Sequence, residues 1–397
     1  MEERLIIKNF GPIKSIDIKL GKITILIGEQ ASGKSTIAKV LAICRYFSYI
    51  TKQSVVNDLN GESDFVVHAL GDWGLKGFQS PDSKIIYENC DYRLVISYSP
   101  IIADGEYKPW SFKPDLTPKS DRFKNLLKQF ESLKPTQDLI FPLKSWNIPH
   151  SFLSTDVKAI MQNPFFFPTE RGLQSLFSIG KRGAENLNDK LYEQLAQLNG
   201  IASSFDREVQ IHPLNLYYKN KDGIGYIKEM KGSDYHNLNQ GASGFKAALP
   251  IILGIKYYDE IDKRKRTFVI EEPEISLFPK SQKSLVEFLV REINDFNHSM
   301  ILTTHSPYIL TALENLMYAS KLGNINEDIK DKVEQIISGK YWIDQKDVNA
   351  YFLGDNTAID IMQREESLIN KDYIDSVSSS INEEYDKLLA LDVALQN

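Results

Sequence analysis

The stretch that decides the fold runs from Lys22 to Ser35 and reads KITILIGEQASGKS. Its first six residues are mainly β-branched and predict a buried strand over 22–27. The glycine- and serine-rich segment that follows fits the pattern G-x-x-x-x-G-K-[ST], and the sequence after it predicts a helix over 36–49. Because this order of strand, glycine loop and helix is what a phosphate-binding loop needs, we interpret the segment as a nucleotide-phosphate site in an α/β domain.

Each residue type in this loop has a physical role. Glycines at 28 and 33 let the backbone wrap around an anion without a Cβ clash, and backbone N–H groups at the start of the helix face the phosphates. Lys34 supplies a positive charge at the β- and γ-phosphates, and the Ser35 hydroxyl can ligate Mg²⁺. The predicted ATP-binding loop consists of Gly28, Glu29, Gln30, Ala31, Ser32, Gly33, Lys34, Ser35 and Thr36.

A second apolar run ends in acidic residues and reads FVIEEPE over 268–274. It predicts a buried strand, and ligands in open α/β sheets bind at the carboxyl ends of the strands. Because successive side chains point in opposite directions, one carboxylate can reach Mg²⁺ while the next polarises a water for attack. Glu271 and Glu272 are the candidates for these two roles, although the segment taken alone is equally a solvated acidic loop.

Two further segments are candidates for the same site. The run ILTTHSP over 301–307 predicts a buried strand that ends in polar residues. His305 at its end can touch the γ-phosphate or the attacking water, although a lone histidine is as often structural. The turn NQGASGFK over 239–246 enters a predicted helix and would expose N–H groups of Ser243 and Gly244 to an anion. The alternative for this turn is a simple helix start with Ser243 as the cap.

The order of predicted elements after residue 239 is strand and helix in alternation, which indicates an α/β fold with a mixed or parallel sheet and flanking helices.

We divide the chain into an N-terminal lobe over 1–179, with an inserted α+β elaboration at about 45–160, and a helical insert over 180–238. A C-terminal lobe over 239–355 and a helical tail over 356–397 follow. Residues 348–353 are expected to form a late strand at the sheet edge.

The composition and the net charge argue against several classes of protein. The 47 Lys and Arg residues are outnumbered by 53 Asp and Glu, a net charge of −6, which disfavours coating of nucleic acid through bulk charge. Cys44 and Cys90 are the only cysteines, which excludes a disulfide scaffold and a CxxC metal site. The basic run over 263–266 is more often a solvated loop than a nucleic-acid contact. Without a signal peptide or a long apolar run, a soluble cytoplasmic protein without membrane contact is expected.

Taken in order, the four motifs resemble those of ABC-type P-loop ATPase heads of the SMC, Rad50, RecF and OLD-like group. The opening segment Ile6–Ile13 also resembles the start of these heads. The resemblance implies that residues 28–36 are the Walker A loop and that Ile270–Glu272 end Walker B. It makes Glu271 the Mg²⁺ ligand, Glu272 the general base, His305 the switch histidine and 241–246 the signature loop. It also implies that ATP is sandwiched between two heads, so that a homodimer or a higher homo-oligomer forms.

The resemblance has departures. The usual signature begins with Leu-Ser, whereas this chain has Gly241-Ala242, so the signature serine role could fall to position 242 or 243. Glu271 stands where many members have aspartate. The glutamine loop is not obvious, and Gln174 is a weak candidate for it.

Residues 167–171, which read FPTER, occupy the expected place of the glutamine loop. They resemble the Pro-x-Glu-Arg segments of AAA_15-type ATPases in bacterial defence systems. A structural salt bridge between Glu170 and Arg171 is an equally good explanation of this segment.

The sequence shows neither sustained heptads for a long coiled coil nor a nuclease motif. Stand-alone heads, such as the ATPase subunits of PARIS-type and Septu-type antiphage systems, work with a separately encoded effector. The resemblance therefore implies a Mg-ATP switch that dimerises and controls an effector, such as a nuclease, in antiphage defence, with a phage protein as a possible trigger. The alternatives are a RecF-like DNA-binding repair ATPase, which the net charge does not favour, and a nucleotide-bound scaffold with negligible turnover.

Overall fold

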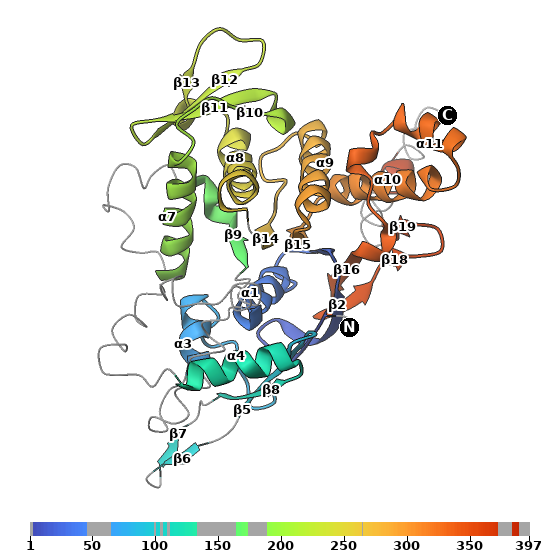
Figure 1. Ribbon diagram of the computed structural model, residues 1–397. Coiled ribbons are helices and arrows are strands. Elements are labelled where there is room, and N and C mark those ends of the chain that lie inside the picture. The colour runs from blue at the N-terminus through green and yellow to red at the C-terminus, as the bar shows by residue number, and fades with distance from the viewer. Residues whose placement is uncertain are drawn as a thin grey trace.

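The computed structural model describes residues 3–45, 65–98, 101–103, 106–108, 112–132, 164–173, 189–263, 265–371 and 383–388. An eleven-stranded sheet runs through the molecule in the order β8-β5-β4-β1-β2-β17-β16-β3-β15-β14-β9 (Figure 1). Gln174 and Arg264, and residues 46–49 of the first predicted helix, lie outside the described residues.

One half of this sheet is parallel. Its inner strands are continuous apolar runs; every residue of β14, for example, is buried, as expected for a strand covered on both faces. Parallel strands present their carboxyl ends at one edge, so the loops that follow them leave the sheet together. The parallel strands are β9 (Phe165–Phe167), β14 (Thr267–Glu271), β15 (Ser299–Thr304), β3 (Ile23–Gly28) and β16 (Val348–Gly354).

The other half is antiparallel. In β2 the buried and exposed residues largely alternate, because these strands have one solvated face over much of their length. Strand β17 (Thr357–Asp360) joins the two halves, since it pairs antiparallel with β16 and parallel with β2. The antiparallel strands are β1 (Glu3–Phe10), β2 (Ile13–Leu20), β4 (Lys84–Glu88), β5 (Tyr92–Tyr98) and β8 (Phe112–Pro118); a hairpin of β6 (Ile101–Ala103) and β7 (Glu106–Lys108) lies between β5 and β8.

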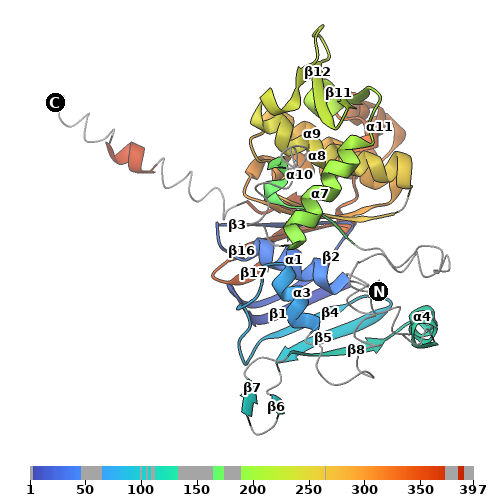
Figure 2. The same ribbon diagram turned by 90° about the vertical axis from the view of Figure 1, so that its left-hand side faces the viewer.

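Helices cover both faces of the sheet. The helices α8 (Ser243–Tyr257), α9 (Pro279–Phe296) and α10 (Pro307–Gly323) lie together on one face (Figures 1 and 2). On the opposite face, α1 (Lys34–Arg45) shares a core with α3 (Phe65–Asp72), and α4 (Asp121–Ser132) contributes Phe123 to it.

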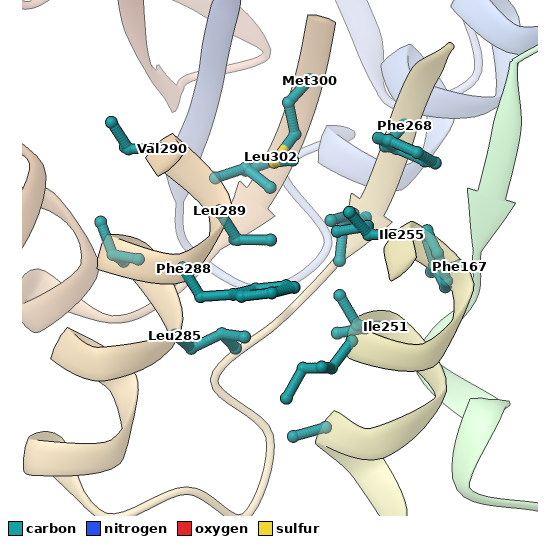
Figure 3. Packing of buried hydrophobic residues seen from close by; sticks show 14 of the residues in the cluster. Phe167, Ile251, Ile255, Phe268, Leu285, Phe288, Leu289, Val290, Met300 and Leu302 are labelled. Carbon is teal, nitrogen blue, oxygen red and sulfur yellow. The ribbon is translucent and has the colours of Figure 1, made fainter. Parts of the chain in front are cut away.

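The two faces have separate hydrophobic cores. Phe268 and Ile270 of β14 point into the core under α8 and α9, whereas Val269 between them belongs to the core under α1. Figure 3 shows Phe268 and Leu302 from the sheet beside Ile255 and Leu289 from the helices. This alternation with a period of two fixes which side of each strand faces which helices.

Several predicted elements match the structure, and three do not. The strands predicted over 22–27 and at the starts of the runs 268–274 and 301–307 are confirmed as β3, β14 and β15. The prediction of an edge position for residues 348–353 is wrong, because β16 lies inside the sheet between β17 and β3.

The helical prediction for residues 180–238 holds only for α7 (Asp189–Ser203). Leu216 and Tyr218 are buried in alternation with partly exposed neighbours, and this period of two gives strands. They belong to a four-stranded antiparallel sheet beyond α8 in Figure 1, made of β10 (Val209–Ile211), β11 (Leu216–Lys221), β12 (Ile224–Glu229) and β13 (His236–Asn237).

The prediction that the tail over 356–397 is helical is wrong for its first part. Besides β17, this part forms a small hairpin of β18 (Met362–Gln363) and β19 (Leu368–Ile369), while residues 383–388 are helical. Before the tail, α11 (Glu327–Glu334) packs against α10. Within the described ranges, none of the helices combines the length and apolar character needed to cross a membrane.

Candidate functional site

Three loops leave the carboxyl edge of the sheet side by side. Strand β15 lies between β3 and β14, and its Thr303 is aligned with Leu26 on one side and Glu271 on the other. The phosphate loop after β3, the acidic segment after β14 and the polar end of β15 therefore meet at one place. The fold thus brings together three of the four segments that the sequence singled out.

The phosphate loop has the backbone that its glycines predict. Gly28 has φ +158° and Gly33 has φ +95°, and Ala31 between them also lies at positive φ, +60°. A Cβ at position 28 would lie 2.2 Å from the carbonyl oxygen of Leu353 on β16. Gly28 is therefore required both by its conformation and by the strand packed beside it.

Lys34 points back into the loop and is 5% exposed. Its Nζ donates hydrogen bonds to the carbonyl oxygens of Gly28 (2.9 Å) and Glu29 (2.5 Å) and to the Ser32 hydroxyl (3.3 Å). Burial lowers the pKa of Lys34 to about 8, and the charges of Glu272 and two other nearby carboxylates oppose that shift. At neutral pH the ammonium is still mostly protonated, so the loop offers a partly desolvated positive charge to an anion.

Glu271 ends β14 and is buried. Burial raises the pKa of its carboxyl group, while Lys39 and a hydrogen bond with the Ser35 hydroxyl act in the opposite direction. Its Oε1 atom is buried and, within the described residues, has no hydrogen-bond partner. A buried carboxylate oxygen without a partner, beside a hydroxyl, fits Mg²⁺, which binds one or two protein oxygens and completes its shell with phosphate and water oxygens.

Glu272 turns the other way, toward solvent. It has φ +43°, and its N–H donates to the carbonyl oxygen of Thr303 at 2.8 Å, so the chain bends sharply directly after Glu271. Its Oε1 lies 3.4 Å from Nε2 of His305. Glu274 fixes the histidine loop, because its Oε1 accepts hydrogen bonds from the Thr304 hydroxyl and the His305 N–H, each at 2.7 Å. The predicted base and the predicted switch histidine are thus neighbours.

Comparison with known proteins identifies the family. A family profile described as an AAA ATPase domain matches residues 1–152 and 169–310. The chain belongs to this family. The matched segments contain the phosphate loop, both carboxylates and His305, so the chain has an α/β P-loop ATPase fold and is an ATP-binding ATPase domain.

Solved structures of similar shape include the SMC head domain from Thermotoga maritima, with 11% identity and a TM-score of 0.40, covering 91% of this chain and 98% of that one. Another is the Smc head domain from Pyrococcus furiosus, with an extended coiled coil and bound to the C-terminal domain of ScpA; it has 10% identity and a TM-score of 0.40, covering 91% and 95%. Among curated proteins, no sequence matches the chain.

Sequence reasoning underestimated one residue of this ATPase domain, Arg171. Its side chain is fully buried, and within the described residues it donates four hydrogen bonds, all to backbone carbonyl oxygens. Nε donates to Ala247 (2.8 Å), Nη1 to Pro168 (2.9 Å) and Glu271 (2.6 Å), and Nη2 to Glu272 (2.7 Å). Burial lowers the pKa of Arg171 to about 10 against the opposing charge of Glu274 and its neighbours, so it remains charged at neutral pH.

The salt-bridge explanation of Arg171 is therefore wrong. Glu170 is exposed and accepts a hydrogen bond from the Thr169 hydroxyl at 3.0 Å. The sequence signal that could have identified Arg171 is its position shortly after three phenylalanines, where a side chain is expected to be buried. Arginine is almost never buried without several partners, so bonds of this kind could have been expected.

Ser243 and Gly244 lie at the start of α8, and no contact recorded within the described part of the chain joins them to the phosphate loop. Ala242 occupies the cap position without a side-chain bond, so the simple explanation that Ser243 caps the helix is wrong. Ser243 is exposed, and its hydroxyl has no partner among the described residues. Gly244 packs on the loop after β14, where an added Cβ would lie 2.6 Å from the carbonyl oxygen of Ser276.

Proposed function

We propose that this chain is a Mg-ATP-dependent molecular switch that hydrolyses ATP and pairs head to head with a second copy. The observation that carries the proposal is the opposite environment of two adjacent carboxylates. Glu271 is buried beside Ser35 with an unpartnered oxygen, whereas Glu272 is 30% exposed beside His305. This is the arrangement that a metal ligand and a general base need.

Each residue of the site has a separate role in the proposed reaction. Backbone N–H groups of residues 28–36 and the Lys34 ammonium bind the β- and γ-phosphates. Ser35 and Glu271 hold Mg²⁺, which neutralises phosphate charge when it is bound. Glu272 accepts the proton of the attacking water, and His305 holds the Glu272 carboxylate and its water in position.

The start of α8 supports the head-to-head arrangement. Ser243 is exposed with a free hydroxyl among the described residues, and an exposed helix start presents N–H groups to an anion. We propose that Ser243 and the backbone at Gly244 contact the nucleotide held by the second head. Homodimers, or higher oligomers built from them, would then form only with ATP between the heads.

The biological role is proposed from the resemblance to stand-alone heads of antiphage systems. In that role the ATP state holds or releases a separately encoded effector, a nuclease being the leading candidate, and a phage protein is the trigger. A net charge of −6 supports a head that acts through a protein partner rather than by direct coating of DNA.

The test uses the purified full chain. Phosphate release should require both ATP and Mg²⁺, and light scattering should show dimers or larger oligomers with ATP but not with ADP. Absence of ATP binding would overturn the proposal, and turnover without any change in mass would overturn its head-to-head part. The effector part is tested by co-expression with a nuclease encoded beside this gene, which should copurify and respond to ATP.

A further inference from the structure

The N-terminal part of α8 and the end of β14 are joined by Arg171. The guanidinium bonds the carbonyl oxygen of Ala247 on α8 and those of Glu271 and Glu272. Because each of its partners among the described residues is a main-chain atom, Arg171 fixes backbone positions rather than another side chain. A planar guanidinium with five donors can bridge these carbonyls at once, whereas an ammonium has three donors and no fixed plane.

Glu272 depends on this bridge for its position. Its φ of +43° is in a region that is unfavourable for a non-glycine residue, so surrounding contacts must hold it there. The Thr303 carbonyl binds the N–H of Glu272, and Arg171 binds its C=O. Without the second of these bonds, the carboxylate would lose its fixed direction toward His305.

A second contact joins the same two elements. Gly244 lies so close to Ser276 that no side chain fits between them, and Ser276 itself has φ +58°. Arg171 and Gly244 therefore tie the beginning and the end of the 271–276 loop to one turn of α8. Any displacement of the exposed Ser243, one residue away, has to move this loop.

We propose that Arg171 is a positioning residue that couples the start of α8 to Glu272, so that a contact made at Ser243 sets the geometry of hydrolysis. The coupling rests on the proposed ATPase function, in which Ser243 meets the second head. Arg171 transmits the effect of that contact to Glu272. ATP itself is bound by the phosphate loop, which lies on the other side of β15.

The experiment compares Arg171→Lys with the wild type and with Arg45→Lys. Arg45 is a matched control, since its side chain is also largely covered (9% exposed) but it pairs with Glu3 on β1. Arg171→Lys should bind ATP within about threefold of the wild type, yet hydrolyse it roughly a hundredfold more slowly. Arg45→Lys should keep turnover within about twofold, even where it lowers Tm. Wild-type turnover in Arg171→Lys, or an equal loss in Arg45→Lys, would overturn the coupling.

Amide hydrogen exchange gives a readout that does not depend on hydrolysis. Arg171→Lys should speed exchange over residues 272–276, and Arg45→Lys should not. A wild-type chain that hydrolyses no ATP would refute the proposed function, but the exchange test would still decide whether Arg171 couples α8 to Glu272. Unchanged exchange over residues 272–276 in Arg171→Lys would refute that coupling. Should Arg171→Lys not fold, Gly244→Ala replaces it, because the added methyl pushes α8 away from Ser276 and should give the same selective loss of turnover.

Discussion

Nε2 of His305 lies 3.4 Å from Oε1 of Glu272, although the two residues follow different strands. Both side chains are about one third exposed, 32% and 30%, so a water molecule can reach them. The contact exists because β14 and β15 are adjacent and parallel and because Glu272 turns out of the sheet directly after the buried Glu271. The carboxylate that we propose as the base and the imidazole that we propose to orient it are thereby held close to the phosphate loop.

Replacement of the proposed base should separate binding from turnover. Glu272→Gln keeps the size of the side chain but cannot accept a proton, so hydrolysis should fall roughly a hundredfold to ten-thousandfold. ATP affinity should stay close to that of the wild type, and the ATP-dependent dimer should persist for longer. Single-turnover phosphate release and ATP titration measure the two quantities separately.

Glu229→Gln is a suitable control for this variant, because Glu229 is an exposed carboxylate on the four-stranded sheet. It should leave both turnover and affinity unchanged. Wild-type turnover in Glu272→Gln would remove Glu272 from the role of base.

The charge of Lys34 predicts a pH dependence of ATP binding. Burial lowers its pKa to about 8, and bound phosphates favour the protonated form, so ATP binding raises that pKa. Affinity should therefore be nearly constant below pH 7 and weaken as the pH rises through 8, by at most about tenfold per pH unit. Titration of ATP between pH 6.5 and about 9.5, a range chosen to bracket this pKa, measures the effect.

Lys34→Arg is the informative control, because a guanidinium stays charged throughout this range. It should bind ATP more weakly than the wild type at neutral pH, with a nearly flat profile. A flat profile in the wild-type chain would show that Lys34 does not titrate in the free site.

The phosphate loop and the acidic end of β14 could be predicted because their information is local. In each, an apolar run of strand length stops at a glycine or a carboxylate, and a helix follows. The prediction of β15 with His305 at its end succeeded for the same reason.

Contacts between distant segments could not be predicted. Nothing near Gly28 indicates that Leu353 lies against it, and nothing in residues 167–171 indicates that Arg171 meets Ala247 and Glu272. The complete four-stranded sheet within 209–237 could not be predicted, because its strands have at most six residues and a polar outer face, which gives too short a period-two signal.

The contact of Gly28 with β16 makes that glycine a stability determinant as well as a phosphate-loop residue. Gly28→Ala places a methyl group 2.2 Å from the Leu353 carbonyl oxygen and forces a side chain to φ +158°. We expect a loss of roughly 2–3 kcal/mol in the free energy of unfolding. Denaturant unfolding without nucleotide measures it.

Gly71→Ala is the matched control, because Gly71 lies in α3 and an added Cβ meets no atom within 4 Å. It should be neutral or stabilise the protein by about 0.5 kcal/mol. Equal stability of the two variants would contradict the close approach of β3 and β16.

A buried group of titratable residues lies at the opposite ends of the same strands. Oδ1 of Asp259 is 2.6 Å from Nε2 of His298, and the Asp259 carboxyl group interacts with that of Glu292. Burial raises the pKa of Asp259 to about 6 and that of Glu292 to about 7, and it lowers the pKa of His298 to about 4. Near neutral pH the histidine is therefore neutral, and the carboxyl pair retains much of one proton.

The raised pKa of Glu292 fixes the sign of its effect on stability. A carboxyl group whose pKa is higher in the folded than in the unfolded state stabilises fully below pH 4.5, and that contribution is lost as the pH rises through 7. Glu292→Gln cannot ionise, so the stability of the variant relative to the wild type should be more favourable at pH 8 than at pH 5, by on the order of 1–3 kcal/mol. The hydrogen bonds that Arg291 donates to Glu292 are weakened at both pH values, which is why the difference between the two pH values, and not either value alone, is diagnostic. Asp295→Asn, at an exposed position of the same helix, should show no such difference, and an equal change in both variants would contradict the raised pKa of Glu292.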